Sequence, residues 1–125
     1  MADRKKTIMC IDDDEDVLMS LRLVLEQNGY AVVEAGTAEE GLAKFKVQKP
    51  DLIIVDLMME EVDAGVNFVK EVRALGGALP IYMLSSVGDQ LNLSTDYASL
   101  GLSGVFQKPI NSKTLLKTLK SKIGA

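Results

Sequence analysis

The run "DLIIVD" at residues 51–56 places four apolar residues in succession between two aspartates, directly after Pro50. A strand with one face in water alternates apolar and polar residues, whereas a strand covered on both faces of a parallel sheet is a continuous apolar run. The run therefore predicts a buried strand of a parallel sheet, with Asp56 at its carboxyl end.

The rest of the chain alternates short strand-like runs with helical patterns. The helical pattern of 87–100 is the weakest, because Ser94, Thr95 and Asp96 compete with the backbone for hydrogen bonds. This β-α alternation implies an α/β fold, with a parallel sheet and helices on both faces. Besides 51–56, strands are predicted at 7–11, 30–35, 79–85 and 104–108, and helices at 16–29, 38–46, 65–77 and 111–124.

Local signals mark the ends of two helices. Gly29 suits the position that follows a helix C-terminus, and Thr37 suits an N-cap. One face of the helix predicted at 65–77 is expected to carry Val66, Val69, Val72 and Leu75.

The composition is that of one globular domain, and residues 1–125 are expected to form a single unit: 47% of the chain is hydrophobic and 26% is charged. The net charge of −4 argues against nucleic acid as a direct partner. The sequence shows no signal peptide and no apolar run long enough to span a membrane, so we expect a cytoplasmic protein without a membrane partner. Cys10, the single cysteine, lies within a predicted strand and is expected to be a small buried hydrophobe.

Polar residues stand at the carboxyl ends of four predicted strands. Asp12 and Asp13 follow the first, Asp56 ends the third, Ser85 ends the fourth and Lys108 ends the fifth. In open α/β sheets, ligands bind outside the carboxyl ends of the strands. These residues are therefore expected to converge on one edge of the sheet and to form the site.

Carboxylates that meet at one edge repel one another and favour a hard cation, which indicates Mg²⁺ or a similar ion. A calcium loop is the competing interpretation of the acidic run at 12–16. It would need a glycine at position 17 and a glutamate at position 23, where the chain has Val17 and Leu23. The calcium-loop interpretation therefore fails.

With a cation in place, a carboxylate can attack phosphorus, because the metal offsets the repulsion between the two anionic groups. Taken singly, Asp56, Ser85 and Lys108 could each be ordinary structural or surface residues. Their joint position at strand ends favours a site that handles a phosphoryl group.

Four segments carry a family resemblance: "IMCIDDD", "DLIIVDLMM", "PIYMLSS" and "VFQKPI". Together they resemble the signature segments of the receiver domains of two-component response regulators, including the chemotaxis regulators. The resemblance covers nearly the whole chain. It implies a flavodoxin-like, doubly wound, five-stranded parallel sheet with strand order 2-1-3-4-5.

The resemblance also implies roles for individual residues. Asp56 would accept a phosphoryl group from a sensor histidine kinase or a phosphotransfer protein, and the chain would catalyse this transfer and its own slow dephosphorylation. Asp12, Asp13, Asp56 and the backbone carbonyl of Met58 would hold Mg²⁺. Ser85 and Lys108 would contact the phosphoryl group, and the Lys108–Pro109 peptide would be cis. Phosphorylation would change an output face at 85–120 that acts on an unknown partner.

The sequence departs from the family pattern in three respects. In the loop after Asp56, Glu60 replaces the usual proline, and Ala64, between Asp63 and Gly65, makes the loop one residue longer. Val105 stands where the family has its aromatic switch residue, with Phe106 predicted on the opposite face of the strand. The segment 85–101 is about one residue longer than usual, which suggests a partner surface unlike that of dimerising transcription factors.

The positions two past Asp56 and two past Ser85 tune hydrolysis in the family. They hold Met58 and Val87 here, and neither side chain offers a group that orients water. This predicts a long-lived phosphorylated state.

Two other functions remain open. A pseudo-receiver would have this fold and bind a partner without phosphorylation, and the altered 56–65 loop favours it slightly. A phosphotransferase or phosphatase for small molecules shares the Asp–Mg²⁺ chemistry, but the sequence has no segment for a cap domain or substrate pocket.

The remaining charges have simpler interpretations. Asp14 is expected near the site without binding metal, and Glu15 and Asp16 are expected in the first turn of the next helix. Lysines gather near the C-terminus and are interpreted as a solvated helix face, with a docking patch as the alternative; they are Lys108, Lys113, Lys117, Lys120 and Lys122.

Overall fold

The computed structural model describes residues 6–56, 64–76, 79–85, 102–107 and 111–123; of residues 64–66, 85 and 107 it describes the backbone alone. Strands and helices alternate over most of this length, as the sequence predicts. The strands are β1 (Thr7–Ile11), β2 (Ala31–Ala35), β3 (Leu52–Asp56), β4 (Ile81–Ser85) and β5 (Gly104–Gln107). The helices are α1 (Glu15–Gln27), α2 (Ala38–Val47), α3 (Ala64–Ala74) and α5 (Ser112–Ile123). The weak helical pattern of 87–100 lies outside the described residues.

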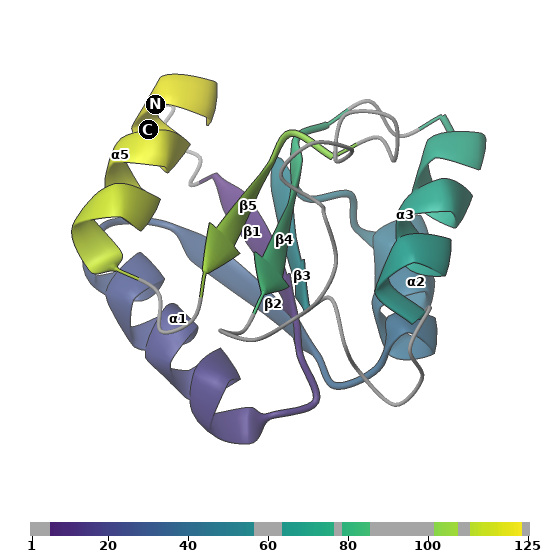
Figure 1. Ribbon diagram of the computed structural model, residues 1–125, viewed down its shortest axis with the longest axis horizontal. Helices are drawn as coiled ribbons and strands as arrows, with labels where there is room; N and C mark the ends of the chain where they lie inside the picture. The colour runs from purple at the N-terminus through teal and green to yellow at the C-terminus, as the bar shows by residue number, and fades with distance from the viewer. Residues whose placement is uncertain (1–5, 57–63, 77–78, 86–101, 108–110, 124–125) are drawn as a thin grey trace.

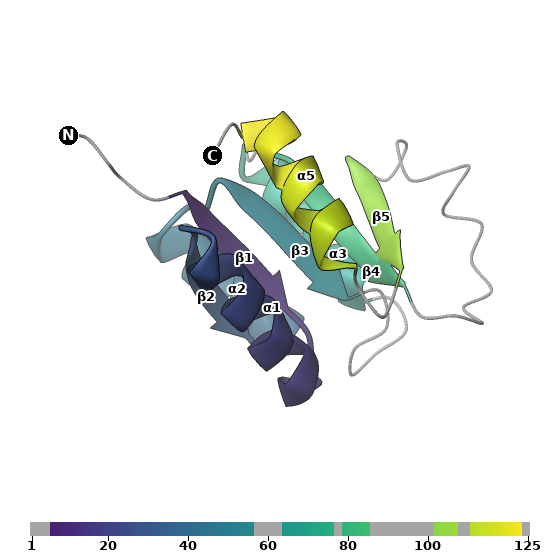
Figure 2. The ribbon, with the colours of Figure 1, turned by 90° about the vertical axis from the view of Figure 1, so that its left-hand side faces the viewer.

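The five strands form one parallel sheet in the order β2-β1-β3-β4-β5. This order confirms the doubly wound, flavodoxin-like fold that the resemblance implies. Figure 1 shows the helices in two layers, with α1 and α5 on one face of the sheet and α2 and α3 on the other. Figure 2 looks onto the layer of α1 and α5, with β2 and β5 at the two edges of the sheet.

Hydrophobic burial on both faces explains the continuous apolar strands. Every residue of β3 is buried, and alternate residues enter different cores. Ile53 and Val55 pack in the core beneath α2 and α3, whereas Leu52 and Ile54 pack in the core beneath α1 and α5. A strand in this position has no solvent-facing side, which accounts for the uninterrupted run in the sequence.

The predicted helix ends are confirmed. Gly29 has φ +89°, and its N–H and that of Tyr30 donate to the carbonyls of Glu26 and Leu25 at the end of α1. This is a Schellman motif, in which glycine adopts the left-handed backbone at little cost. Thr37 caps α2 by accepting a hydrogen bond from the Glu40 N–H at 3.0 Å. Within the described residues, no helix is long and apolar enough to cross a membrane.

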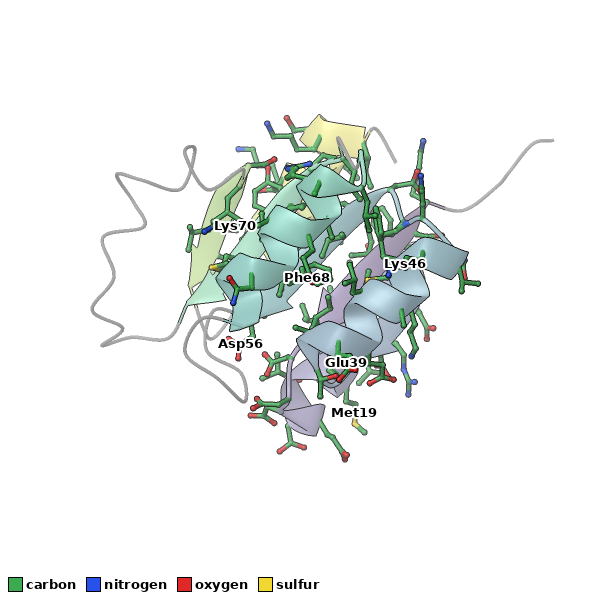
Figure 3. The ribbon with its side chains drawn as sticks, turned by 90° about the vertical axis from the view of Figure 1, so that its right-hand side faces the viewer. Met19, Glu39, Lys46, Asp56, Phe68 and Lys70 are labelled. Carbon is green, nitrogen blue, oxygen red and sulfur yellow. The ribbon has the colours of Figure 1, made fainter. Side chains whose placement is uncertain are left out.

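The predicted apolar face of α3 is confirmed at two positions and wrong at Leu75, whereas the side chain of Val66 lies outside the described residues. Val69 and Val72 are fully buried, but Leu75 lies in the turn after the helix and is 47% exposed. Phe68 is buried instead and lies between α3 and α2, as Figure 3 shows. The helix ends at Ala74, so its helical spacing does not extend to Leu75.

The opposite directions predicted for Val105 and Phe106 are confirmed. Val105 packs against the core under α2 and α3, whereas Phe106 is buried in the core under α1 and α5. There the Phe106 ring stacks on Tyr82, with 5.0 Å between ring centroids and 24° between planes. Gly104 makes room for this pair, because a Cβ at residue 104 would stand 2.7 Å from Tyr82 Cε2.

Gly104→Ala is expected to lower the free energy of unfolding by about 1–3 kcal/mol, the usual cost of overpacking a core. Without a clash, replacing a strand glycine by alanine would be neutral or stabilising. Urea denaturation measures the effect in the wild type and in Tyr82→Leu, which removes the ring. We expect a smaller cost in the Tyr82→Leu background. An equal cost in both backgrounds would show that the ring is not the constraint.

Candidate functional site

The first site residue, Asp12, directly follows β1. Its N–H donates to the Ala35 carbonyl at 3.1 Å and so extends the pairing of β1 with β2 by one residue. Its side chain is 1% exposed, and Oδ1 accepts the Asp14 N–H at 2.9 Å. The second oxygen, Oδ2, is also buried. Asp12 is therefore a buried carboxylate held in one orientation by the backbone.

Asp56 is the last residue of β3 and is 5% exposed. The register pairs Ile11 with Val55, so Asp12 and Asp56 occupy the next row of the two neighbouring strands. Figure 3 shows the Asp56 carboxylate at the end of the sheet. The predicted convergence of these two acids is confirmed.

Asp13, which is exposed, completes a group of three carboxylates with Asp12 and Asp56. One oxygen of each lies within 4.8 Å of the others. At this separation and an effective dielectric of about 20, a pair of full charges repels by about 3 kcal/mol, and by less at an exposed residue. Oxygen ligands in this arrangement suit a hard cation such as Mg²⁺ or Ca²⁺.

The other acids of the run hold the start of α1. Asp14 is the N-cap, and its Oδ1 accepts the Asp16 N–H at 2.9 Å. Glu15 and Asp16 lie in the first turn, as predicted, where the helix dipole favours negative charge. Asp14 is predicted from the sequence to lie near the site, and its role as a cap was not predicted. An aspartate just before an apolar periodic run is the signal that would have indicated it.

The structure describes the remaining predicted site residues only in part. The backbone of Ser85 ends β4 and pairs with Gln107, the last residue of β5. Ser85 is thus at the same edge of the sheet as Asp56, which pairs with Leu84. Lys108 directly follows Gln107 but, like Met58 and the Lys108–Pro109 peptide, lies outside the described residues.

The buried thiol of Cys10 lies near this edge but has the properties of a core residue. It is fully buried, and burial, followed by the charges of Glu34 and Asp12, raises its pKa. A thiol with a raised pKa stays protonated at neutral pH and is a poor nucleophile. The predicted structural role of Cys10 is confirmed.

Comparison with known proteins identifies relatives over most of the chain. A family model described as the response regulator receiver domain matches residues 8–120. The alkaline phosphatase synthesis transcriptional regulatory protein PhoP of Bacillus subtilis is 31% identical over 116 residues, which cover 93% of this chain and 48% of PhoP. The chemotaxis protein CheY of the same organism is 29% identical over 113 residues, which cover 90% of this chain and 92% of CheY.

A solved structure gives the same result. The Vibrio cholerae chemotaxis protein CheY4 superimposes with a TM-score of 0.85 at 31% identity, covering 96% of this chain and 100% of CheY4. The chain thus spans about half the length of PhoP and nearly the whole length of the chemotaxis proteins.

Mg²⁺ is expected to raise the melting temperature of the wild type, because a cation bound to the three carboxylates stabilises only the folded state. At a concentration about one hundred times its Kd, this stabilisation is about 2.7 kcal/mol. Without Mg²⁺, Asp13→Asn should have a higher melting temperature than the wild type, because one of the repelling charges is gone. Its melting temperature should rise much less when Mg²⁺ is added, because one charged ligand is missing. Glu39→Gln, at an exposed acid outside the trio, is the control and should respond to Mg²⁺ as the wild type does. Equal Mg²⁺ responses in Asp13→Asn and the wild type would contradict a cation site here.

Proposed function

The chain belongs to the response regulator receiver domain family, and from this premise we propose that Asp56 accepts a phosphoryl group in a two-component phosphorelay. The donor is a sensor histidine kinase or a phosphotransfer protein, and the exchange takes place in the cytoplasm. The observation that carries the proposal is the position of Asp56, at the end of a buried strand and within 4.8 Å of two further carboxylates.

Mg²⁺ is the proposed cofactor, held by Asp12, Asp13 and Asp56, with the backbone carbonyl of Met58 as a further ligand. The donor set supports this choice, since the described ligands are all carboxylate oxygens. When bound, Mg²⁺ offsets the negative charge of the three acids and of the incoming phosphoryl group.

The reaction transfers the phosphoryl group from the donor's imidazole to the Asp56 carboxylate. An Asp56 carboxylate oxygen forms a bond to phosphorus, and the bond from phosphorus to the donor's imidazole nitrogen breaks. The imidazole keeps the electron pair. Asp56 is suited to this attack because the end of β3 fixes its backbone.

Ser85 and Lys108 are proposed to bind the phosphoryl oxygens opposite the metal ligands. The end of β4 carries the Ser85 backbone to the same edge as Asp56, and β5 ends one residue before Lys108. A hydroxyl and an ammonium group stabilise the charge that develops on the transferred group. Their contact with phosphorylated Asp56 then changes the output face at 85–120, which acts on a partner of unknown identity.

Val105 bears on how this change is transmitted. It is partly buried and packs against the core under α2 and α3, at the position where the family has its aromatic switch residue. A rotating aromatic side chain at this position is therefore excluded. We propose that the signal passes through the segment that begins at Ser85.

Incubation with Mg²⁺ and acetyl phosphate is expected to give one phosphoryl adduct, detected by intact-protein mass spectrometry. Asp56→Asn should give no adduct, because an amide is a poor nucleophile. Asp51→Asn changes an acid at the opposite end of β3 and serves as the matched control; it should be phosphorylated as the wild type is. A wild type without an adduct would favour the pseudo-receiver, which binds its partner without phosphorylation.

The phosphorylated state is expected to be long-lived, since Met58 and Val87 offer no group that orients a water molecule for hydrolysis. Decay of the adduct measures this lifetime. Met58→Gln introduces an amide that can hold a water, and should shorten the half-life severalfold, whereas Met58→Leu should leave it unchanged. A wild-type half-life as short as that of the fast chemotaxis regulators would contradict the expectation.

A further inference from the structure

Strand β2 is an edge of the sheet, and the described part of the chain places no strand on its outer side. The Ala31 N–H donates to Lys6 and the Ala35 carbonyl accepts from Asp12, so residues 31, 33 and 35 direct their backbone groups toward β1. Since these directions alternate along a strand, Val32 and Glu34 direct their N–H and C=O groups outward. Such groups can pair with a further strand.

Side chains of α2 close the carboxyl end of this edge. Lys44 Nζ donates to the Glu34 carbonyl, and the Gly36 N–H donates to Glu40 Oε1 at 2.9 Å. The two side chains are themselves paired, with 3.1 Å between Lys44 Nζ and Glu40 Oε2. The Lys44 and Glu40 side chains thus bond the outward carbonyl of Glu34 and the outward N–H of Gly36, as the backbone of a neighbouring strand would. The Val32 N–H, the Val32 carbonyl and the Glu34 N–H remain directed toward the outside.

A groove of about 740 Å³ runs between α1 and this edge, and it is strongly acidic. Its two cations, Arg22 and Lys44, are already paired with Glu34 and Glu40, at 3.7 Å and 3.1 Å. Six carboxylates line the groove, from Asp12, Asp13, Glu15, Glu26, Glu34 and Glu40. The groove therefore has an excess of negative charge that favours a cationic occupant.

The other flank of β2 is mainly apolar. A hollow of about 470 Å³ between β2 and α2 exposes chiefly Val33, Ala43 and Val47, with Glu40, Lys44 and Gln48 also in its lining, and Val47 is 89% exposed. A strand lying along β2 would thus meet acids on the α1 side and an apolar surface on the α2 side.

We propose that the outer edge of β2 is an interaction surface for an extended segment of a partner protein, which pairs with Val32 and Glu34 as a sixth strand. Successive side chains of a strand point to opposite faces. The segment therefore alternates lysine or arginine, directed toward α1, with apolar residues directed toward α2. Its backbone supplies hydrogen bonds, and its charges provide the specificity.

The negative charge of the groove favours this occupant over two others. A second copy of the chain would bring the same acidic groove against this one, and the like charges would repel. Nucleic acid is repelled for the same reason. A basic strand is attracted by the groove and satisfies the outward backbone groups.

The probe is a short end-blocked peptide of alternating lysine and valine, with a peptide of alternating glutamate and valine as its control. Binding to the whole chain is measured by isothermal titration calorimetry, and protection of the Val32 and Glu34 amides by hydrogen exchange. We expect the lysine peptide to bind and to slow the exchange of both amides, and the glutamate peptide not to bind.

Val32→Pro tests the strand pairing directly, because it removes an outward donor and no bond to β1. The variant should weaken peptide binding roughly tenfold, the effect of losing one hydrogen bond. Thermal melting and Mg²⁺ binding confirm that the variant is folded.

Glu26→Gln tests the charge independently of the backbone. It should weaken binding, whereas Glu39→Gln makes the same change at an exposed acid of α2 outside the groove and should not. Equal weakening by the two variants would show non-specific attraction, and tight binding to a folded Val32→Pro would exclude strand pairing. Self-association of the wild type that Val32→Pro abolishes would identify a second copy as the occupant. Each of these results would overturn the proposal, and none depends on phosphorylation of Asp56.

Discussion

The parallel register of β1, β3 and β4 is the constraint on which the site depends. Parallel strands end at the same edge of the sheet. The residues that follow neighbouring strands therefore lie close together, independently of the conformation of the loops. Asp12 and Asp56 meet because Ile11 pairs with Val55, and Ser85 follows Leu84, which pairs with Asp56. The acids are thus positioned by buried apolar strands, which hold them more precisely than loops would.

That precision has an electrostatic cost, which gives the site its chemistry. Asp12 and Asp56 are almost wholly buried beside a third carboxylate, and buried charges are unfavourable without a compensating partner. Part of the compensation is internal: Asp12 accepts a backbone N–H, and the N-terminus of α1 lies directly after the acids. A cation can add to this compensation, so the repulsion among these acids also gives the site its affinity for metal.

The sequence predicted the elements and the acids well, because each rests on a local pattern. The continuous run at 52–55, shortly after Pro50, is typical of a strand covered on both faces, and a parallel sheet of such strands places the ligands at its carboxyl end. Strand order followed from family resemblance alone, since apolar periodicity does not say which strand lies beside which. The predicted burial of Leu75 was wrong because the apolar pattern of the sequence continues past Ala74, where the helix ends. The contact of Lys44 with the Glu34 carbonyl was not predictable, because it depends on how α2 packs beside β2.

The two acidic regions of the molecule share Asp12 and Asp13, which belong to the trio of carboxylates and also line the groove beside β2. Glu40 and Lys44 occupy the outward groups of Gly36 and Glu34, so a strand added to β2 ends before it reaches Asp12 and Asp13. Both surfaces can then be occupied at once. A cationic segment in the groove would reduce the negative potential at the trio, because Asp12 and Asp13 themselves line the groove. Because the coupling of binding free energies is reciprocal, such a segment would weaken cation binding by the same factor as the cation weakens binding of the segment.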